Sequence, residues 1–358
     1  MRIGIQGVGL TGGFGSGVDS LQAALQSGKV VTQQREALHN GEVDIYPAYL
    51  ASLDRLEEFI PKRALRRIDH CSRMTLLAAH LALQDAGMPE SERSRIGVII
   101  ASGYGPLQTT CDFLDSYLDF GYACSSPTHF SNSVHNAAAA HLSMQLKTTA
   151  PSLTVTQFEM SVPSALLTAQ QWLIEGRVDR LLFGAVDEQC EVLRYCRRQF
   201  FAAGEQGPLQ PLAFSTQSAV VGEGAVFLLL TRDEVAAYGH IDEVRLGNHS
   251  VAPLSLSDDD LLILGADGHK ECGRWYTQAA RGHEVAAYAP FYGSFPAAAG
   301  FDLAVAALSL RDNRLYPGLA STGASTLTAA TPGELNGRKL ACLKFGSAGE
   351  YGLTRMSR

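Results

Sequence analysis

The stretch Ser152-Leu-Thr-Val-Thr-Gln-Phe-Glu159-Met-Ser-Val-Pro-Ser164 joins a short β-type run to the start of a helical pattern. The apolar positions that follow are spaced four, three and four apart, which predicts a helix with one buried face. They are Val162, Leu166, Ala169 and Leu173. A strand that turns sharply into a helix presents one side chain at the helix N-terminus, where an anion is favoured. Such elbows usually carry a cysteine or serine nucleophile. Here Glu159 holds that position, and a carboxylate is a poor acyl acceptor.

The residues around Glu159 resemble the elbow of the β-ketoacyl-ACP synthases, which runs from a strand through Thr-Ala-Cys-Ser/Ala-Ser into a helix. In this alignment Glu159 stands at the place of the family's catalytic cysteine. Residues 66–87 are similar to the family's first long helix, and Ser126–Asn136 to the segment that forms much of its dimer interface. Gly222-Glu-Gly-Ala225 matches a Gly-Glu-Gly-Ala signature. The resemblance is clear to about residue 230 and weaker beyond.

The resemblance implies an α/β protein with the thiolase fold, in which two similar α-β-α-β-α halves form a five-layered core. The alternation of strand and helix patterns agrees with this class. A second strand and elbow are predicted over 283–297, so we place the halves at 1–230 and 231–358. The sequence predicts strands at Arg2–Gln6, Ile96–Ala101, Val178–Gly184 and Ala225–Leu230, with Arg338–Phe345 as the last strand, and helices at Val18–Gln26, Met74–Asp85 and Ala298–Leu308.

The other catalytic positions of the family are also replaced in this sequence. A working synthase needs two histidines that help to decarboxylate the malonyl extender and stabilise the enolate. Asp267 stands at the place of the first histidine, although a shifted register would place His269 there instead. Ser294 stands at the place of the second histidine and Ala289 at that of the lysine in the same motif. Four reactive groups are therefore missing together.

A synthase-like chain without these groups resembles the chain-length factors, most closely those of aryl-polyene-type pathways. The resemblance implies a catalytically inactive subunit without a cofactor. It also implies a heterodimer with an active β-ketoacyl-ACP synthase, whose acyl tunnel this chain closes in polyene, polyketide or fatty-acid biosynthesis. By the same resemblance, the tunnel residues are Leu107, Thr110, Cys111, Leu114, His129 and Ser133. Ordinary packing in the core or at an interface is the alternative role for each of them.

Four basic residues, spaced about one helical turn apart, precede the first long helix. They are Lys62, Arg63, Arg66 and Arg67. The family receives its acidic acyl carrier protein in the corresponding region, so the resemblance implies carrier-protein docking here. A solvated helix face is the alternative role.

Composition excludes several other classes of function. With 29 basic and 36 acidic residues, the net charge of −7 argues against general nucleic-acid binding. Seven scattered cysteines without a Cys-x-x-Cys pair indicate reduced thiols and no zinc site. No apolar run approaches the roughly 18 residues of a membrane helix. We therefore expect a cytoplasmic protein of 358 residues without membrane insertion and without a metal.

Two alternative functions stay open at this point. Gly7-Val-Gly9-Leu-Thr-Gly12 satisfies Gly-x-Gly-x-x-Gly, which is typical of an NAD(P)-binding oxidoreductase. The acidic residue expected about 20 positions later is absent, and the synthases also open with a strand and a glycine-rich turn. The second alternative is a β-ketoacyl-ACP synthase or malonyl-ACP decarboxylase that uses acidic residues. In that case Glu159, Asp267 and His269 would converge for acid/base work.

Overall fold

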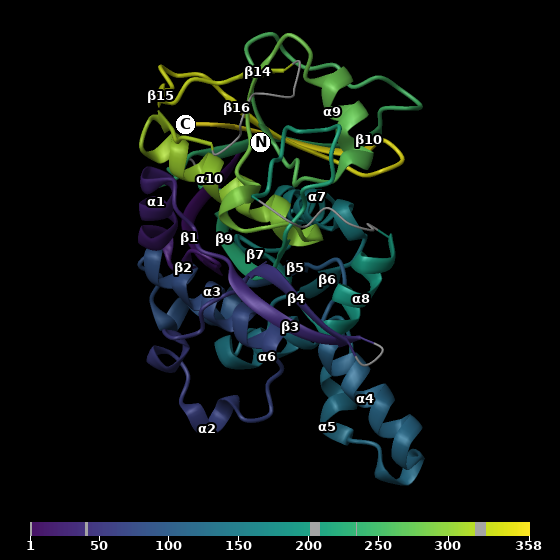
Figure 1. The fold of residues 1–358 in the computed structure, drawn as a ribbon. Helices are drawn as coiled ribbons and strands as arrows, with labels where there is room; N and C mark the ends of the chain where they lie inside the picture. Colours follow the sequence, from purple (N-terminus) through teal and green to yellow (C-terminus); the bar gives the residue numbers. More distant parts are fainter. Residues whose placement is uncertain (1, 40–41, 201–207, 234, 319–326) are drawn as a thin grey trace.

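The computed structural model describes residues 2–39, 42–200, 208–233, 235–318 and 327–358 (Figure 1). Its main sheet consists of two half-sheets with the same strand order. The N-terminal half-sheet runs β6 (Ser152–Val155), β5 (Gly97–Ala101), β7 (Arg180–Asp187), β9 (Gly224–Thr231) and β1 (Ile3–Gly12). The C-terminal half-sheet runs β12 (Glu284–Ala286), β11 (Leu261–Leu264), β16 (Leu340–Phe345), β17 (Glu350–Ser357) and β10 (His240–Asn248).

The two half-sheets also share their strand directions. In each, the first three strands are parallel and the last two are antiparallel to their neighbours. A short antiparallel contact of β1 with β10, from Ile3 to Ile241, joins the halves into one sheet. Repeated topology of this kind is what a duplicated α/β unit produces.

Three separate apolar clusters show how the layers are stacked. The largest lies between the half-sheets and contains α7 (Ser161–Ile174) and α10 (Ala299–Arg311), with Leu166 and Phe301 among its residues. The second joins the outer face of the N-terminal half-sheet to α3 (His70–Asp85) and α6 (Ala137–Leu146). The third covers the C-terminal half-sheet with α9 (Gly273–Ala279). Five layers result, which confirms the predicted fold class.

Two predicted elements differ from the structure. The strand predicted over Arg2–Gln6 continues through the glycines as β1, because Gly7 and Gly9 let α3 lie directly on the strand. A Cβ on Gly9 would lie 2.1 Å from both Ala78 O and Ala82 N. The Gly-x-Gly-x-x-Gly motif therefore lies inside a strand and forms no phosphate-binding turn. Arg338–Phe345 is not the last strand, since β17 follows it and pairs with β10.

The other predicted elements are present with small shifts of their ends. They include α1 (Val18–Ser27), which ends at Gly28 in the left-handed conformation. Outside the layers lie a hairpin of β3 (Gln33–His39) and β4 (Glu42–Tyr49), and α4 (Leu107–Phe120) with α5 (Pro127–Asn132), which extend away from the body (Figure 1). The remaining elements are β2 (Gly15–Ser16), α2 (Lys62–Leu65), α8 (Glu191–Phe200), β8 (Val221–Gly222), β13 (Arg314–Leu315), β14 (Thr328–Ala329) and β15 (Gly333–Glu334).

None of the helices in the described ranges is long and apolar enough to cross a membrane.

Candidate functional site

The first elbow has the strand, turn and helix that the sequence predicts. Strand β6 passes through the 3-10 turn η4 (Phe158–Met160) into α7, with Phe158 at a left-handed φ of 47°. Ser161 fixes the turn, because its Oγ accepts a hydrogen bond from Gln157 N at 2.7 Å and donates one to Ser102 O at 3.0 Å. Glu159 lies partly buried just before the helix N-terminus. Among the described residues, no hydrogen bond or ion pair involves its carboxylate.

The second elbow joins β12 to α10 through η6 (Ala289–Phe291) and η7 (Pro296–Ala298). Gly293 has a φ of +90°, and a Cβ there would lie 2.8 Å from the Cα of Gly222. Ser294 N donates to Val220 O at 2.7 Å, so the elbow is fixed to the strand that carries the Gly-Glu-Gly-Ala motif. Ala289 is buried in the central cluster. Gly222 and Gly293 thus allow the same close backbone contact between the Gly-Glu-Gly-Ala motif and the second elbow.

Asp267 and Ser294, which stand at the two histidine positions, are in direct contact. Ser294 Oγ donates to Asp267 Oδ2 at 3.0 Å. Lys344, on β16, places its ammonium 3.2 Å from the same oxygen and 2.9 Å from Gly265 O. The side chains of Lys344 and Asp267 are 7% and 11% exposed. Sequence reasoning missed Lys344, although a lysine within the apolar strand Leu340–Phe345 is the signal that reveals it.

The charges of this centre are balanced internally. Burial alone would raise the pKa of Asp267, but the Lys344 ammonium, the nearby His269 and the Ser294 hydroxyl hold it well below its usual range. Burial would likewise lower the pKa of Lys344, and the Asp267 carboxylate keeps it above its usual value. The pair is therefore ionised, and each charge compensates the other.

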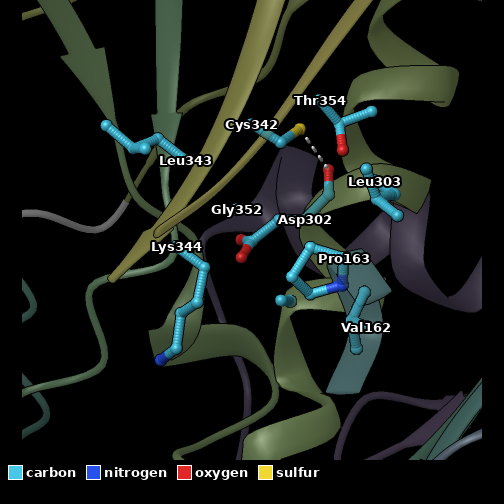
Figure 2. A pocket seen from close by; sticks show the side chains of 10 residues that line it. Val162, Pro163, Asp302, Leu303, Cys342, Leu343, Lys344, Gly352 and Thr354 are labelled. Carbon is cyan, nitrogen blue, oxygen red and sulfur yellow. Dashed lines mark hydrogen bonds between the residues drawn. The ribbon is translucent and has the colours of Figure 1, made fainter. Parts of the chain in front are cut away.

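A second buried carboxyl group, Asp302 on α10, lines a very small cavity together with Lys344 (Figure 2). Burial raises the pKa of Asp302 to about 7, against the hydrogen bond donated by the Tyr292 hydroxyl and the charge of Lys344. The cavity has a volume of about 20 Å³ between α7, α10, β16 and β17. That volume accommodates about one water molecule and no acyl substrate.

The larger cavity near the elbows has a volume of about 460 Å³ and a mostly apolar wall. Its wall comes from α8, the start of α4 and the second elbow, and Ser294 contributes to it. Tyr104 links it to the first elbow, since its ring lies 5.8 Å from that of Phe158. Arg197 also lines it, and burial lowers the pKa of this guanidinium against the opposing charge of Asp267. The wall consists of Tyr104, Leu107, Asp187, Glu188, Gln189, Val192, Leu193, Cys196, Arg197, Phe200, Gly222, Ser294, Phe295 and Pro296.

Asp187 holds the two elbows in their mutual position. Its Oδ1 accepts hydrogen bonds from Ser102 Oγ at 2.7 Å and Gly103 N at 2.9 Å, and its Oδ2 accepts one from Ala297 N at 2.9 Å. Burial raises its pKa to about 6 against these bonds. A carboxyl group at the end of β7 thus connects β5 to the second elbow. Tyr104 and Asp187 were not identified from the sequence, and Arg197 was not assigned to this site.

His269 lies near Asp267 but has its own partner. Gln217 Nε2 donates to His269 Nδ1 at 2.8 Å, so the ring proton is on Nε2. Burial lowers the pKa of His269 to about 4, which leaves the imidazole neutral. In the part of the chain that the structure describes, no group of three or more His, Cys, Asp or Glu side chains is arranged to hold a metal ion.

The residues predicted to close an acyl tunnel fall into three groups. Leu107, Cys111 and Leu114 lie along one side of α4, and Leu107 also lines the large cavity. Thr110 and Ser133 meet, because Thr110 Oγ1 donates to Ser133 O at 3.1 Å. His129 lies on the short helix α5 and lines a separate polar cavity to which Arg66 and Arg67 also contribute.

The four basic residues are exposed, as a docking surface requires. Lys62 and Arg63 lie on the one-turn helix α2, while Arg66 and Arg67 follow it. Lys62 Nζ is 3.9 Å from Glu57 Oε1, a loose surface pair. Their role in carrier-protein docking stays a prediction.

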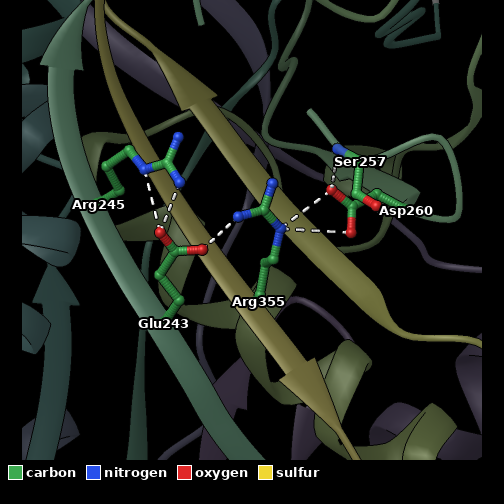
Figure 3. Close-up of polar contacts among 5 residues, drawn as sticks. All are labelled: Glu243, Arg245, Ser257, Asp260 and Arg355. Carbon is green, nitrogen blue, oxygen red and sulfur yellow. Dashed lines mark hydrogen bonds and ion pairs between the residues drawn. The ribbon is translucent and has the colours of Figure 1, made fainter. Parts of the chain in front are cut away.

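A separate polar network lies on the outer face of the C-terminal half-sheet (Figure 3). Arg355 on β17 binds Asp260 at 3.0 Å and also Glu243 on β10, while Glu243 binds Arg245 at 2.6 Å. Since Leu353 lies on the same face two residues earlier, these charges continue the surface that α9 covers. The network is distant in sequence from both elbows and is structural.

The five-layered core with two facing elbows defines a thiolase-fold protein. A family model described as "Beta-ketoacyl synthase, N-terminal domain" matches residues 2–236, and the chain therefore belongs to the β-ketoacyl synthase family. It is 25% identical over 191 residues to 3-oxoacyl-[acyl-carrier-protein] synthase 2 of Mycobacterium tuberculosis, which covers 51% of this chain and 46% of that protein. The chain is 24% identical over 196 residues to the chloroplastic synthase I of Hordeum vulgare, which covers 52% and 42%. These matches span less than half the length of either relative.

Solved structures share the fold over nearly the whole chain. The complex of the ketosynthase ApeO with its chain length factor ApeC from Xenorhabdus doucetiae gives a TM-score of 0.81 at 15% identity, covering 99% of this chain and 98% of that one. The ishigamide ketosynthase/chain length factor gives 0.79 at 17% identity, covering 99% and 98%. The ketosynthase complex AntDE:AntF gives 0.82 at 15% identity, covering 99% of each chain. At these identities the likeness concerns the fold.

Proposed function

We propose that this protein is a catalytically inactive chain-length factor that pairs with an active β-ketoacyl-ACP synthase and shapes its acyl tunnel. The observation that carries the proposal is the composition of the centre between the elbows. Glu159 stands where a nucleophile is needed, and Asp267 is bound to Lys344 and Ser294. An ionised, mutually satisfied pair neither attacks a thioester nor stabilises an enolate oxygen.

The surface supports a partner chain beside the first elbow. β6 is the edge strand of the main sheet, and an edge with free N–H and C=O groups is a template for pairing. Exposed apolar side chains gather on α4, on α5 and just after α5, where a soluble monomer would normally be polar. They are Leu114, Tyr117, Leu118, Phe120, Phe130 and Val134.

The proposal includes the finer features that the resemblance implies. The partner's acyl chain would end against Leu107, Cys111 and Leu114, and the carrier protein would dock near Lys62 and Arg66 in the cytoplasm. The biosynthetic product would be a polyene, polyketide or fatty acid, and a type II PKS ketosynthase complex is among the solved structures that share the fold. The division into residues 1–230 and 231–358 is kept as part of the proposal.

The proposal is tested with the isolated chain, with a synthase partner that retains its cysteine and two histidines, and with both together. Radiolabelled acyl-ACP and malonyl-ACP are supplied, and the chains are separated under denaturing conditions. We expect label only on the synthase and products of controlled length only from the mixture. A partner with its cysteine replaced by alanine is the control for non-covalent label. Covalent label on this chain, condensation by it alone, or carbon dioxide release from malonyl-ACP by it alone would overturn the proposal.

The role of α4 is tested by the length of the product. Leu114→Trp should shorten the main product and Leu114→Ala should lengthen it or broaden its distribution, because packed walls do not yield to added volume. Val251→Trp, at a highly exposed loop position, is the matched control and should leave the product unchanged. An unchanged product in both Leu114 variants would contradict a ruler role for α4.

A further inference from the structure

Helix α4 carries two parallel stripes of different chemistry. One consists of Leu107, Cys111, Leu114 and Leu118, and the other of Gln108, Asp112, Asp115 and Asp119. Each has spacings of four, three and four, so each runs straight along the helix and the two lie next to each other. An apolar stripe bordered by charge is the usual form of a helix that packs against another chain.

The apolar stripe becomes more exposed with distance from the body of the protein. Leu107 lines the large cavity, whereas Leu114 is 48% and Leu118 is 75% exposed. The opposite side of α4 is already occupied, because Phe113 packs against Phe130 of α5 with ring centroids 5.4 Å apart. Figure 1 shows α4 and α5 extending together away from the layers. The stripe is thus exposed toward the far end of α4, where Tyr117 and Phe120 are exposed as well.

The chain segment from α4 to the end of α6 carries formal charge of one sign only. From residue 107 to 146 the sequence contains three aspartates and no lysine, arginine or glutamate. Within the described ranges, none of the three aspartates lies within ion-pair distance of a basic side chain. Asp112 accepts a hydrogen bond from Gln108 Nε2 at 2.7 Å and shares the polar cavity with Arg66 and Arg67. Among the described residues, Asp115 and Asp119 share no cavity with a basic side chain. Their negative charges are therefore uncompensated at the far end of the stripe.

The negative charge of α4 determines which partner its surface binds. In a symmetric pair of identical chains, the same patch meets itself, so this segment would oppose acid to acid or to neutral groups. Like charges across an interface disfavour a complex, and opposite charges accelerate its formation.

We propose that the acidic stripe of α4 selects the partner: it docks an apolar face of the active synthase subunit that is bordered by lysine or arginine, and it discourages pairing of two copies of this chain. This inference rests on the proposed function, since it specifies the chemistry of the surface that the synthase must offer. The apolar stripe supplies the buried area of the contact, and Asp115 and Asp119 supply the discrimination.

The test compares two double variants with the same change in charge. Asp115→Lys/Asp119→Lys reverses the stripe, and Asp258→Lys/Asp259→Lys reverses two exposed acids on a loop of the C-terminal half. Binding to the synthase is measured by surface plasmon resonance at about 0.05 M and about 0.5 M salt. We expect the first variant to bind at least about tenfold more weakly, mainly through a slower association rate, and the second to bind as the wild type does. The wild-type complex should weaken at the higher salt concentration.

Self-association gives a second, independent measurement. In sedimentation equilibrium the Asp115→Asn/Asp119→Asn variant should dimerise at lower concentration than the wild-type chain, and circular dichroism verifies that each variant is folded. If both lysine double variants bind the synthase with equal affinity, and if the wild-type complex does not depend on salt, the inference is overturned. The proposed heterodimer would still stand in that case. Absence of any complex between the wild-type chain and a synthase would instead refute the proposed function.

Discussion

The first elbow, at Glu159, stays partly open, whereas the second elbow, at Ser294, is enclosed by the core. Phe158 is 59% exposed, and the Glu159 carboxylate has no hydrogen-bond partner among the described residues. Ser294 is 2% exposed and belongs to a chain of contacts through Asp267 to Lys344. Both elbows have the same origin in the fold, a strand that turns into a central helix. They differ in what surrounds the position where chemistry would occur.

The difference shows that the two positions are under different physical constraints. A side chain at an open elbow is solvated, so a glutamate costs little there. A charge enclosed by the core must be paired, because desolvation of a lone carboxylate costs several kcal/mol. Lys344 therefore accompanies Asp267, whereas Glu159 needs no companion. Substitutions should accordingly cost much at the second elbow and little at the first.

The largest effect is expected when Lys344 is removed. Lys344→Met leaves the Asp267 carboxylate buried with Ser294 as its remaining partner, and breaking a buried pair in this way costs about 3 to 5 kcal/mol. The free energy of unfolding is measured by urea denaturation. The double variant Asp267→Asn/Lys344→Met removes both charges and should recover most of that loss.

A half-exposed ion pair is the control for this variant. Arg2 and Asp242 are 2.9 Å apart, but their side chains are 51% and 21% exposed. Asp242→Asn should therefore cost at most about 1 kcal/mol. If Lys344→Met costs no more than Asp242→Asn, the second elbow is not held by its charged pair, and the contrast between the elbows fails.

A smaller effect is expected in the pH dependence of stability. Burial raises the pKa of Asp302 to about 7, so between the unfolded value near 4 and this value the folded protein binds a proton that the unfolded chain has released. The contribution of Asp302 to stability is therefore largest below that range and falls as pH rises toward 7, by roughly 2 to 4 kcal/mol. Asp302→Asn should flatten the slope, measured by urea denaturation at several pH values.

Other buried carboxyl groups also contribute to the decrease of stability with pH, so the wild type and the Asp302→Asn variant must be compared directly. Burial also raises the pKa of Asp187 to about 6 and that of Glu188 to about 7, so the variant should keep part of the pH dependence. The informative quantity is the difference between wild type and variant. Identical slopes would show that Asp302 is not a protonated member of the enclosed centre.

The sequence revealed the positions of both elbows and not their surroundings. Glu159, Asp267 and Ser294 were found because local motifs keep their glycines and their spacing around the lost groups. Lys344 and Asp187 were missed, because each reaches the second elbow from an element remote in sequence. Asp302 was missed although it lies on α10, directly after that elbow, because no local motif marks it. The fold class follows from patterns of strands and helices, which are local properties. The partners of a buried charge depend on packing between layers, which no single segment encodes.

The length of β1 shows a second reason why a prediction from sequence alone can be wrong. Glycine inside a strand usually indicates a turn or bulge, so the sequence predicts that the first strand ends at Gln6. In the structure, Gly7 and Gly9 are needed because the backbone of α3 lies against the strand. The requirement comes from a helix some 70 residues later in the chain, from Ala78 to Ala82. Contacts of this kind override the local preference of the residue.

The smallest effect is expected at Glu159. Glu159→Gln should change the free energy of unfolding by less than about 1 kcal/mol, because a partly exposed carboxylate without a hydrogen-bond partner contributes little to stability. Glu159→Cys should place a thiol near the N-terminus of α7 that iodoacetamide alkylates faster than the buried Cys71 and Cys342, a reaction followed by mass spectrometry. The same variant should still release no carbon dioxide from malonyl-ACP, since Asp267 and Ser294 occupy the places of the two histidines. Condensation restored by this one substitution would mean that the enclosed elbow retains its chemistry, and the contrast between the two elbows would then have no functional meaning.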